Sequence, residues 1–165
     1  MKNLKLIKKH LIQQSYKLAI AESLSSGNIQ AKIGGISGAS SFFEGGLTVY
    51  SVEQKVKILK IDKAHAVQVN SVSKRVAREM AMGVCRVFNT EIGISTTGYA
   101  EPYPAMKIKN AFAYFCVWDN VKQRIILENK VNLLEDSRIA NQQFLTETVI
   151  VQLAECFKKD RNNSI

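Results

Sequence analysis

Helical and strand-like residue patterns alternate along the chain, and this alternation restricts the possible folds more than any other feature. Leu4, Ile7 and Leu11 recur at helical spacing, whereas the apolar run 17–21 after them is typical of a short buried strand. Ser73 directly precedes another helical pattern. It marks the start of a helix, because a serine side chain caps the free N–H groups there. We expect helices over 2–15, 28–34, 52–59, 73–87 and from about 136, and strands over 17–21, 42–51, 92–97, 110–118 and 124–133.

Helices that precede, separate and follow strands predict a three-layer α/β/α sandwich with a mixed sheet of about five strands. A turn at Asp119-Asn120 joins the last two strands, which favours an antiparallel hairpin at one side of the sheet. The length of 165 residues suits one core. We therefore expect a single domain over 1–157 and a frayed polar tail over 158–165.

Composition argues against several classes of protein. No apolar run approaches the ~20 residues of a membrane span, and Lys8 and Lys9 interrupt the apolar positions near the start, so we expect a cytoplasmic protein. The three cysteines lie far apart without a CxxC pair, and the two histidines are also distant from each other. This pattern predicts no disulfide framework and no metal site, and no cofactor is indicated.

The net charge of +9 favours anionic partners such as nucleic acid, phosphorylated metabolites or a membrane surface. The basic residues are nevertheless dispersed over several segments, with no RNP-like aromatic motif and no strongly basic helix. A solvated basic surface is the simpler interpretation, and neither nucleic acid nor a membrane is expected as a native partner.

Two hydroxyl-rich turns follow predicted strands and are candidate ligand-binding segments. Ser23, Ser25, Ser26 and Gly27 follow the first strand, where backbone N–H groups at a helix start can bind an anion. The same serines would also serve simply to cap the helix. A second set, Thr97 and Gly98, lies at the carboxyl end of a later strand, where open α/β sheets bind ligands.

A possible catalytic set consists of Ser40, Tyr50 and Lys55. A serine becomes a nucleophile when a base removes its proton, and a buried lysine of lowered pKa, assisted by a tyrosine hydroxyl, is such a base. The alternative is a serine-rich turn, a strand aromatic and a surface lysine. Farther along, Arg138 at the entry to the last helix is either a bidentate phosphate ligand or an ordinary surface charge.

Taken in order, these segments resemble the CinA C-terminal domain family, the nicotinamide-mononucleotide amidohydrolases. That family shows the runs A-E-S-C-T-G-G, G-S-S-x-x-F-x-G-G, Y-S-N-E-x-K, G-A-V-S-x-x-V-A-x-E-M-A, S/T-G-I-A-G-P and G-D-R. The corresponding stretches here are 21–27, 38–46, 50–55, 70–81, 97–102 and 136–138.

The resemblance implies hydrolysis of the carboxamide of nicotinamide mononucleotide, giving nicotinate mononucleotide and ammonia. It places Ser40 as the nucleophile, Tyr50 and Lys55 as its activating partners, Thr97 as a substrate-contacting hydroxyl and Arg138 on the phosphate side. The implied partner is a phosphorylated nucleotide, no cofactor is required, and a homo-oligomer is expected. The alternative is an inactive relative that keeps the fold and binds a nucleotide or a protein.

Three departures from the family pattern fall in the expected substrate pocket. Cys-Thr-Gly-Gly becomes the run 24–27, Ala-Gly-Pro becomes the run 100–102 with Glu101 in place of glycine, and the glycine-rich loop is replaced over 103–111. A carboxylate near a phosphate site costs binding energy unless it is paired, and we expect Lys107 or Lys109 to pair with Glu101.

Overall fold

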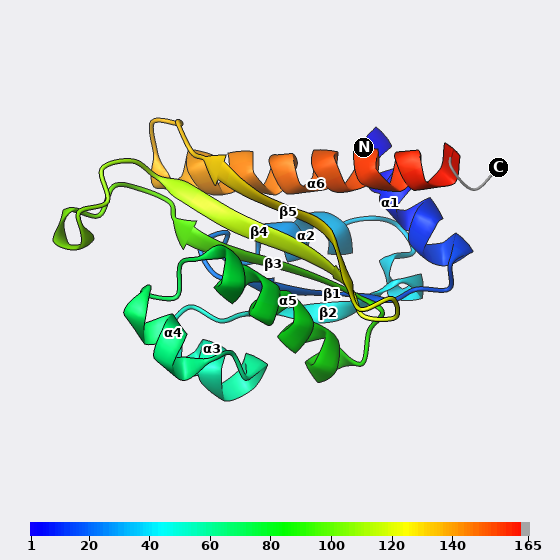
Figure 1. The fold of residues 1–165 in the computed structure, drawn as a ribbon. Helices are drawn as coiled ribbons and strands as arrows, with labels where there is room; N and C mark the ends of the chain where they lie inside the picture. The colour runs from blue at the N-terminus through cyan, green and yellow to red at the C-terminus, as the bar shows by residue number, and fades with distance from the viewer. Residues whose placement is uncertain (163–165) are drawn as a thin grey trace.

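One mixed five-stranded sheet lies between two layers of helices in the computed structural model, which describes the backbone of residues 1–162 (Figure 1). The strand order is β2-β1-β3-β4-β5, with β1, β2 and β3 parallel and β3, β4 and β5 antiparallel in succession. The strands are β1 (Leu18–Glu22), β2 (Phe43–Thr48), β3 (Ile92–Tyr99), β4 (Phe112–Asp119) and β5 (Arg124–Asn132). The predicted layered architecture, mixed sheet and terminal hairpin are confirmed.

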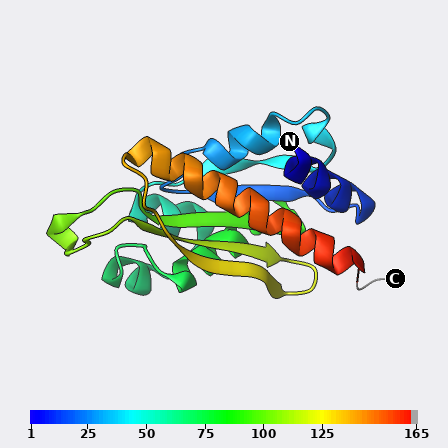
Figure 2. The same ribbon diagram turned by 90° about the horizontal axis from the view of Figure 1, so that it is seen from above.

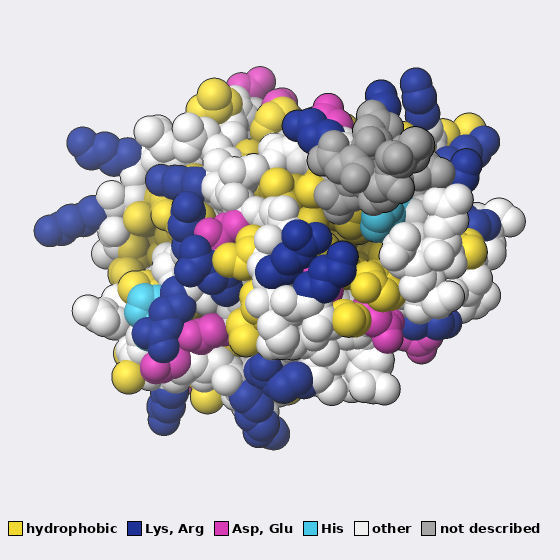
Figure 3. All heavy atoms as spheres, turned by 45° about the vertical axis from the view of Figure 1, so that its right-hand side comes forward, with side chains coloured by type: hydrophobic (Ala, Val, Ile, Leu, Met, Phe, Trp, Pro, Cys, Tyr) yellow, Lys and Arg dark blue, Asp and Glu magenta, His cyan; other side chains and the backbone are white. Residues whose placement is uncertain are grey.

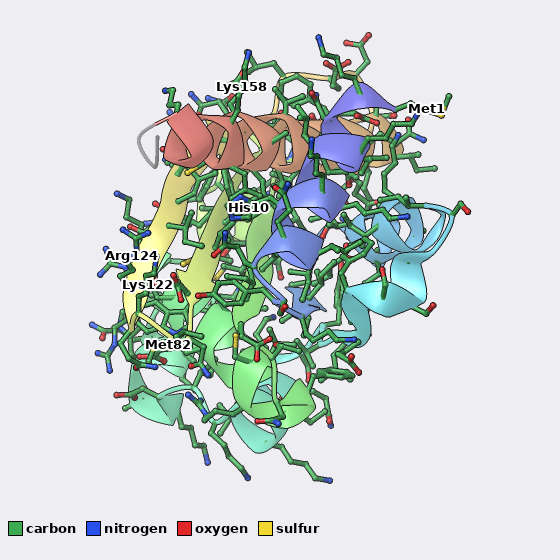
Figure 4. All side chains as sticks on the ribbon, turned by 90° about the vertical axis from the view of Figure 1, so that its right-hand side faces the viewer. Met1, His10, Met82, Lys122, Arg124 and Lys158 are labelled. Carbon is green, nitrogen blue, oxygen red and sulfur yellow. The ribbon has the colours of Figure 1, made fainter. Side chains whose placement is uncertain are left out.

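The helices divide between the two faces of the sheet, as Figures 1 and 2 show from the side and from above. One face carries α1 (Lys2–Gln13), α2 (Asn28–Gly34) and α6 (Arg138–Asn162), and the other carries α3 (Val52–Leu59), α4 (Lys63–Gln68) and α5 (Lys74–Phe88). On the first face α1, which carries the labelled His10 in Figure 4, packs against α6. The His10 ring stacks on the Phe157 ring with 3.9 Å between centroids.

Strand β1 shows how one short sequence serves both layers of the core. Its side chains alternate, so Leu18 and Ile20 join the cluster beneath α1, α2 and α6, whereas Ala19 and Ala21 join the cluster beneath α3, α4 and α5. All five residues of the strand are buried, which explains why its sequence is apolar until the final Glu22. The strand is the centre of the parallel part of the sheet and leads directly into a buried turn.

The structure adds three short helices that the sequence did not predict: α4 and the 3-10 helices η1 (Ala39–Ser41) and η2 (Pro104–Met106). Helix α6 continues to Asn162, so 158–162 of the predicted tail have helical backbone, and 163–165 lie outside the described residues. None of the described helices is long and apolar enough to cross a membrane.

Lys and Arg side chains lie in separate groups over the face shown in Figure 3, with acidic and apolar side chains between them.

Gly93 lets α5 lie directly on β3. A Cβ atom at this position would come within 2.2 Å of the Ala81 carbonyl oxygen and 2.6 Å of Cys85 Sγ. We predict that Gly93→Ala lowers the free energy of unfolding by about 1–3 kcal/mol, because the overlap involves helix backbone that has to shift. In the control Gly34→Ala, the added Cβ meets only the Phe43 ring at 3.7 Å, and stability stays equal or rises. Urea denaturation measures both, and equal effects of the two substitutions would contradict the close approach.

Candidate active site

A pocket of about 500 Å³ opens at the carboxyl ends of β1, β2 and β3, which is where parallel α/β sheets bind ligands. Its size suits a small molecule. Each strand end contributes polar groups: Ser23 after β1, Tyr50 and Lys55 after β2, and Thr97 and Gly98 at the end of β3. Arg138 adds a guanidinium from the first residue of α6.

The turn after β1 is fixed by the carboxylate of Glu22, which is fully buried. Its two oxygens accept hydrogen bonds from the backbone N–H groups of Gly27, Ile29 and Gln30 at 3.0, 3.2 and 2.8 Å. These amides belong to the start of α2, where a helix has no internal acceptors and carries partial positive charge. The carboxylate thus ties the end of β1 to the start of α2 and determines the path of the turn between them.

Ser23 is the first residue of that turn, and its side chain lines the pocket although the residue is only 6% exposed. The other small hydroxyls there are already engaged: Thr97 Oγ1 donates to the Ser71 carbonyl at 2.6 Å, and Ser51 Oγ accepts from the Gln54 amide as the cap of α3. Among the described residues, none forms a side-chain hydrogen bond with Ser23 Oγ. Ser23 is therefore the hydroxyl best placed to react with a molecule in the pocket.

Lys55 supplies a base in the same pocket. Its side chain is 3% exposed, and Nζ donates to the Tyr50 carbonyl oxygen at 2.8 Å. Burial lowers the pKa of Lys55 from 10.5 to about 8, because desolvation penalises the ammonium form, and the negative charge of Glu53 only partly opposes this shift. At pH 7 roughly a tenth of the molecules thus carry Lys55 as an uncharged amine, and this form can accept a proton.

Ser40 does not join this set, and its assignment as the nucleophile is wrong. It lies exposed in η1 before β2 begins, whereas Tyr50 and Lys55 follow the end of that strand. The six residues of β2 are separated by rises of about 3.3 Å, so the two ends of the strand are roughly 17 Å apart. The segment between Ser40 and Tyr50 runs the whole length of β2, so the serine lies at the amino end of this strand, opposite the end at which the pocket opens.

The predicted anion cradle over Ser25, Ser26 and Gly27 is also wrong, because the groups it needs are used inside the fold. The Gly27 amide donates to Glu22, and the Ser26 amide donates to the Ser23 carbonyl oxygen at 3.1 Å. Ser25 is fully buried and its hydroxyl is 2.6 Å from Thr96 Oγ1. Of the predicted binding residues, Ser23, Thr97, Gly98 and Arg138 do line the pocket.

At the mouth of the pocket, Arg138 binds two residues of the surrounding loops. One terminal nitrogen donates to Glu101 Oε1 at 2.8 Å and the other donates to the Tyr50 hydroxyl. The partner of Glu101 is therefore Arg138 and not the expected Lys107 or Lys109. The Tyr50 hydroxyl likewise accepts from Arg138, whereas Lys55 Nζ donates to the Tyr50 backbone carbonyl, so among the described residues no hydrogen bond joins Lys55 to this hydroxyl for the predicted proton relay.

Sequence reasoning missed Asn70, which lines the pocket and donates to the Tyr99 hydroxyl at 3.0 Å. Asn70 adopts a positive φ of 48°, a backbone conformation that asparagine tolerates better than most residues.

The buried thiols of Cys85 and Cys116 are not suited to react as thiolates in this pocket. Burial raises the pKa of Cys85 to about 11 and that of Cys116 to about 12, and neither residue lines the pocket.

Comparison with known proteins agrees with this architecture. The model of the CinA C-terminal domain matches residues 2–157. A putative competence-damage inducible protein of Clostridium kluyveri is 44% identical over 92 residues, which are 56% of this chain but only 22% of that protein. The chain thus spans about a fifth of the length of such relatives. A shorter relative, the MG115 homolog of Mycoplasma pneumoniae, is 31% identical over 113 residues, covering 68% of this chain and 72% of the relative.

Solved structures share the fold at lower identity. A CinA superfamily protein from Klebsiella pneumoniae superposes with a TM-score of 0.86 at 19% identity, covering 96% of this chain and 97% of that one. A competence/damage inducible protein from Agrobacterium tumefaciens gives a TM-score of 0.80 at 18% identity over 94% of this chain and 96% of its own. These similarities establish the fold alone.

We predict that Glu22→Gln lowers the free energy of unfolding by about 1–3 kcal/mol, because an amide nitrogen replaces one accepting oxygen and leaves a buried N–H without a partner. Chemical denaturation measures the loss. Glu44→Gln is the control, since it removes an exposed carboxylate paired with Lys17 at 2.9 Å and is expected to change stability by less than about 1 kcal/mol. Equal stabilities for the two variants would contradict the role of Glu22.

Proposed function

The chain belongs to the CinA C-terminal domain family, and from that premise we propose that it hydrolyses the carboxamide of nicotinamide mononucleotide through an acyl-enzyme on Ser23. The products are nicotinate mononucleotide and ammonia. The observation that carries the proposal is the placement of Ser23 and the buried Lys55 in one pocket at the carboxyl ends of adjacent parallel strands.

Acylation requires a serine that loses its proton as it attacks. Ser23 Oγ attacks the carboxamide carbon while the uncharged amine of Lys55 accepts the hydroxyl proton. The Lys55 ammonium then returns that proton to the leaving nitrogen as the C–N bond breaks, so that ammonia departs and an ester with Ser23 remains. In the second half, Lys55 removes a proton from water as the water oxygen attacks the ester, and the Lys55 ammonium then returns that proton to Ser23 Oγ as the ester C–O bond breaks, so that the acid is released and both side chains are restored.

The negative oxygen that forms during each attack needs a hydrogen-bond donor. Leu24 directly follows the nucleophile and lines the pocket, and among the described residues its backbone N–H has no hydrogen-bond partner. We assign this amide to the oxyanion. The nearby Gly27 amide is bound to Glu22 and is not available for this role.

The rest of the substrate is held by groups around the rim. Asn70 and Tyr99 offer polar atoms and an aromatic surface in the pocket lining, and Arg138 offers a cation at the mouth. In the proposed complex the carboxamide lies next to Ser23 and the anionic group lies toward Arg138. This arrangement agrees with a nucleotide whose reactive ring and phosphate lie at opposite ends.

The direct test is ammonia release from nicotinamide mononucleotide by the wild type, Ser23→Ala and Ser40→Ala. We expect Ser23→Ala to lose at least about a thousandfold in kcat while substrate binding persists, because the hydroxyl acts in the covalent step. Ser40→Ala is the matched control and retains activity, since that serine lies before β2 begins, at the end of the strand away from the pocket. Turnover that survives Ser23→Ala, or is lost in Ser40→Ala, contradicts the assignment.

The lowered pKa of Lys55 predicts the pH dependence of the reaction. The uncharged amine is the active form, so kcat/KM rises with pH and levels off above about 8. Lys55→Arg removes activity over this whole range, because a guanidinium remains protonated. Initial rates between pH 6 and 9.5 measure the profile. A kcat/KM that falls as pH rises through 8 would indicate that the ammonium is the required form.

A further inference from the structure

The formal charges of the side chains that line the pocket sum to zero. Two basic groups, Lys55 and Arg138, line it together with two acidic groups, Glu53 and Glu101. When Lys55 is in its uncharged form, the remaining formal charge is negative. Lys107 and Lys109 lie on the neighbouring loop but do not line the pocket. A phosphate dianion thus meets little net attraction, although the chain as a whole carries +9.

Arg138 is the one pocket cation that does not serve as the proposed base, and both of its terminal nitrogens are already engaged. They donate to Glu101 Oε1 and to the Tyr50 hydroxyl. Tight recognition of a phosphate by arginine uses two parallel N–H groups at once. A phosphate therefore has to displace the Glu101 carboxylate before it can bind this guanidinium in that way.

Displacement does not remove the carboxylate from the site. Glu101 lies on the loop after β3 and lines the same pocket, so it stays close to a phosphate bound at Arg138 and repels it. The side chains of Glu101 and Arg138 are 57% and 38% exposed. Solvent screens the repulsion at these exposures, so the effect on binding is several-fold in size rather than absolute.

We propose that Glu101 is a specificity-determining residue: as the internal counter-ion of Arg138, it lowers the preference of the pocket for phosphorylated carboxamides over their unphosphorylated counterparts. The substrate class thereby widens to include carboxamide nucleosides, which have no phosphate to compete for the guanidinium. The part of this inference that concerns turnover rests on the proposed function, whereas the part that concerns binding does not.

The test compares nicotinamide mononucleotide with nicotinamide riboside. Dissociation constants are measured by calorimetry in the Ser23→Ala background, so the result is independent of turnover. We expect Glu101→Gln to raise the affinity for the mononucleotide relative to the riboside by about three- to tenfold at low ionic strength. High salt reduces the gain, and adding Arg138→Ala also reduces it, because only the direct repulsion by Glu101 is then left to relieve. In the otherwise wild-type enzyme, the ratio of kcat/KM values shifts in the same direction.

Glu44→Gln is the matched control. It removes the same charge from an exposed glutamate, 42% exposed and paired with Lys17 at 2.9 Å, that does not line the pocket. We expect no change in the ratio of affinities for this variant. An unchanged ratio in Glu101→Gln, an equal gain in both variants, or no binding of the mononucleotide to any variant overturns the proposal. An absence of ammonia release with the expected shift in binding would instead contradict only the proposed reaction.

Discussion

The buried carboxylate of Glu22 is the interaction on which the rest of the site depends. It binds three amides at the start of α2, so the chain leaves β1 along one defined path and the next residue, Ser23, enters the pocket. The charge is stable in the core because helix N-terminal amides replace the water that it loses. A site on such a turn is positioned by secondary structure on both sides, which favours precise placement of a reacting group.

The second constraint is the burial of Lys55. An ammonium group in an almost fully buried position destabilises the fold at neutral pH, because the unfolded chain binds this proton more tightly than the folded one. The folded pKa of about 8 lies below the ordinary 10.5, so this penalty is present below pH 8 and is relieved as pH rises from 8 toward 10.5. Lys55 thus lowers the stability of the fold at the pH at which it would act as a base. A cost of this kind is expected at a residue on which catalysis depends.

The sequence predicted the fold well because its periodicities are set by burial. Strand β1 is apolar throughout, and α5 places Val76, Met80 and Val84 on one face, so the elements and layers could be predicted from pattern alone. The site was harder to predict, because spacing along the chain does not say at which end of the strands a residue lies. Ser40 and Lys55 are separated by a whole strand, whereas Ser23 and Thr97 both lie at carboxyl strand ends, a signal that could have identified Ser23. The pairing of Glu101 with Arg138 joins a loop to a helix start far along the chain, and no local pattern specifies it.

The central claim is that Ser23 forms the covalent intermediate, and mass spectrometry of acid-quenched enzyme tests it most directly. Trypsin separates the candidates, since cleavage after Lys17, Lys32 and Lys55 places Ser23 in the peptide 18–32 and Ser40 in the peptide 33–55. After rapid mixing with nicotinamide mononucleotide and quenching, we predict that the acyl group is found on the peptide 18–32, with fragmentation locating it at Ser23, and that it is absent from the Ser23→Ala variant. An acyl group on Ser40, or on any residue of the peptide 33–55, would contradict the account.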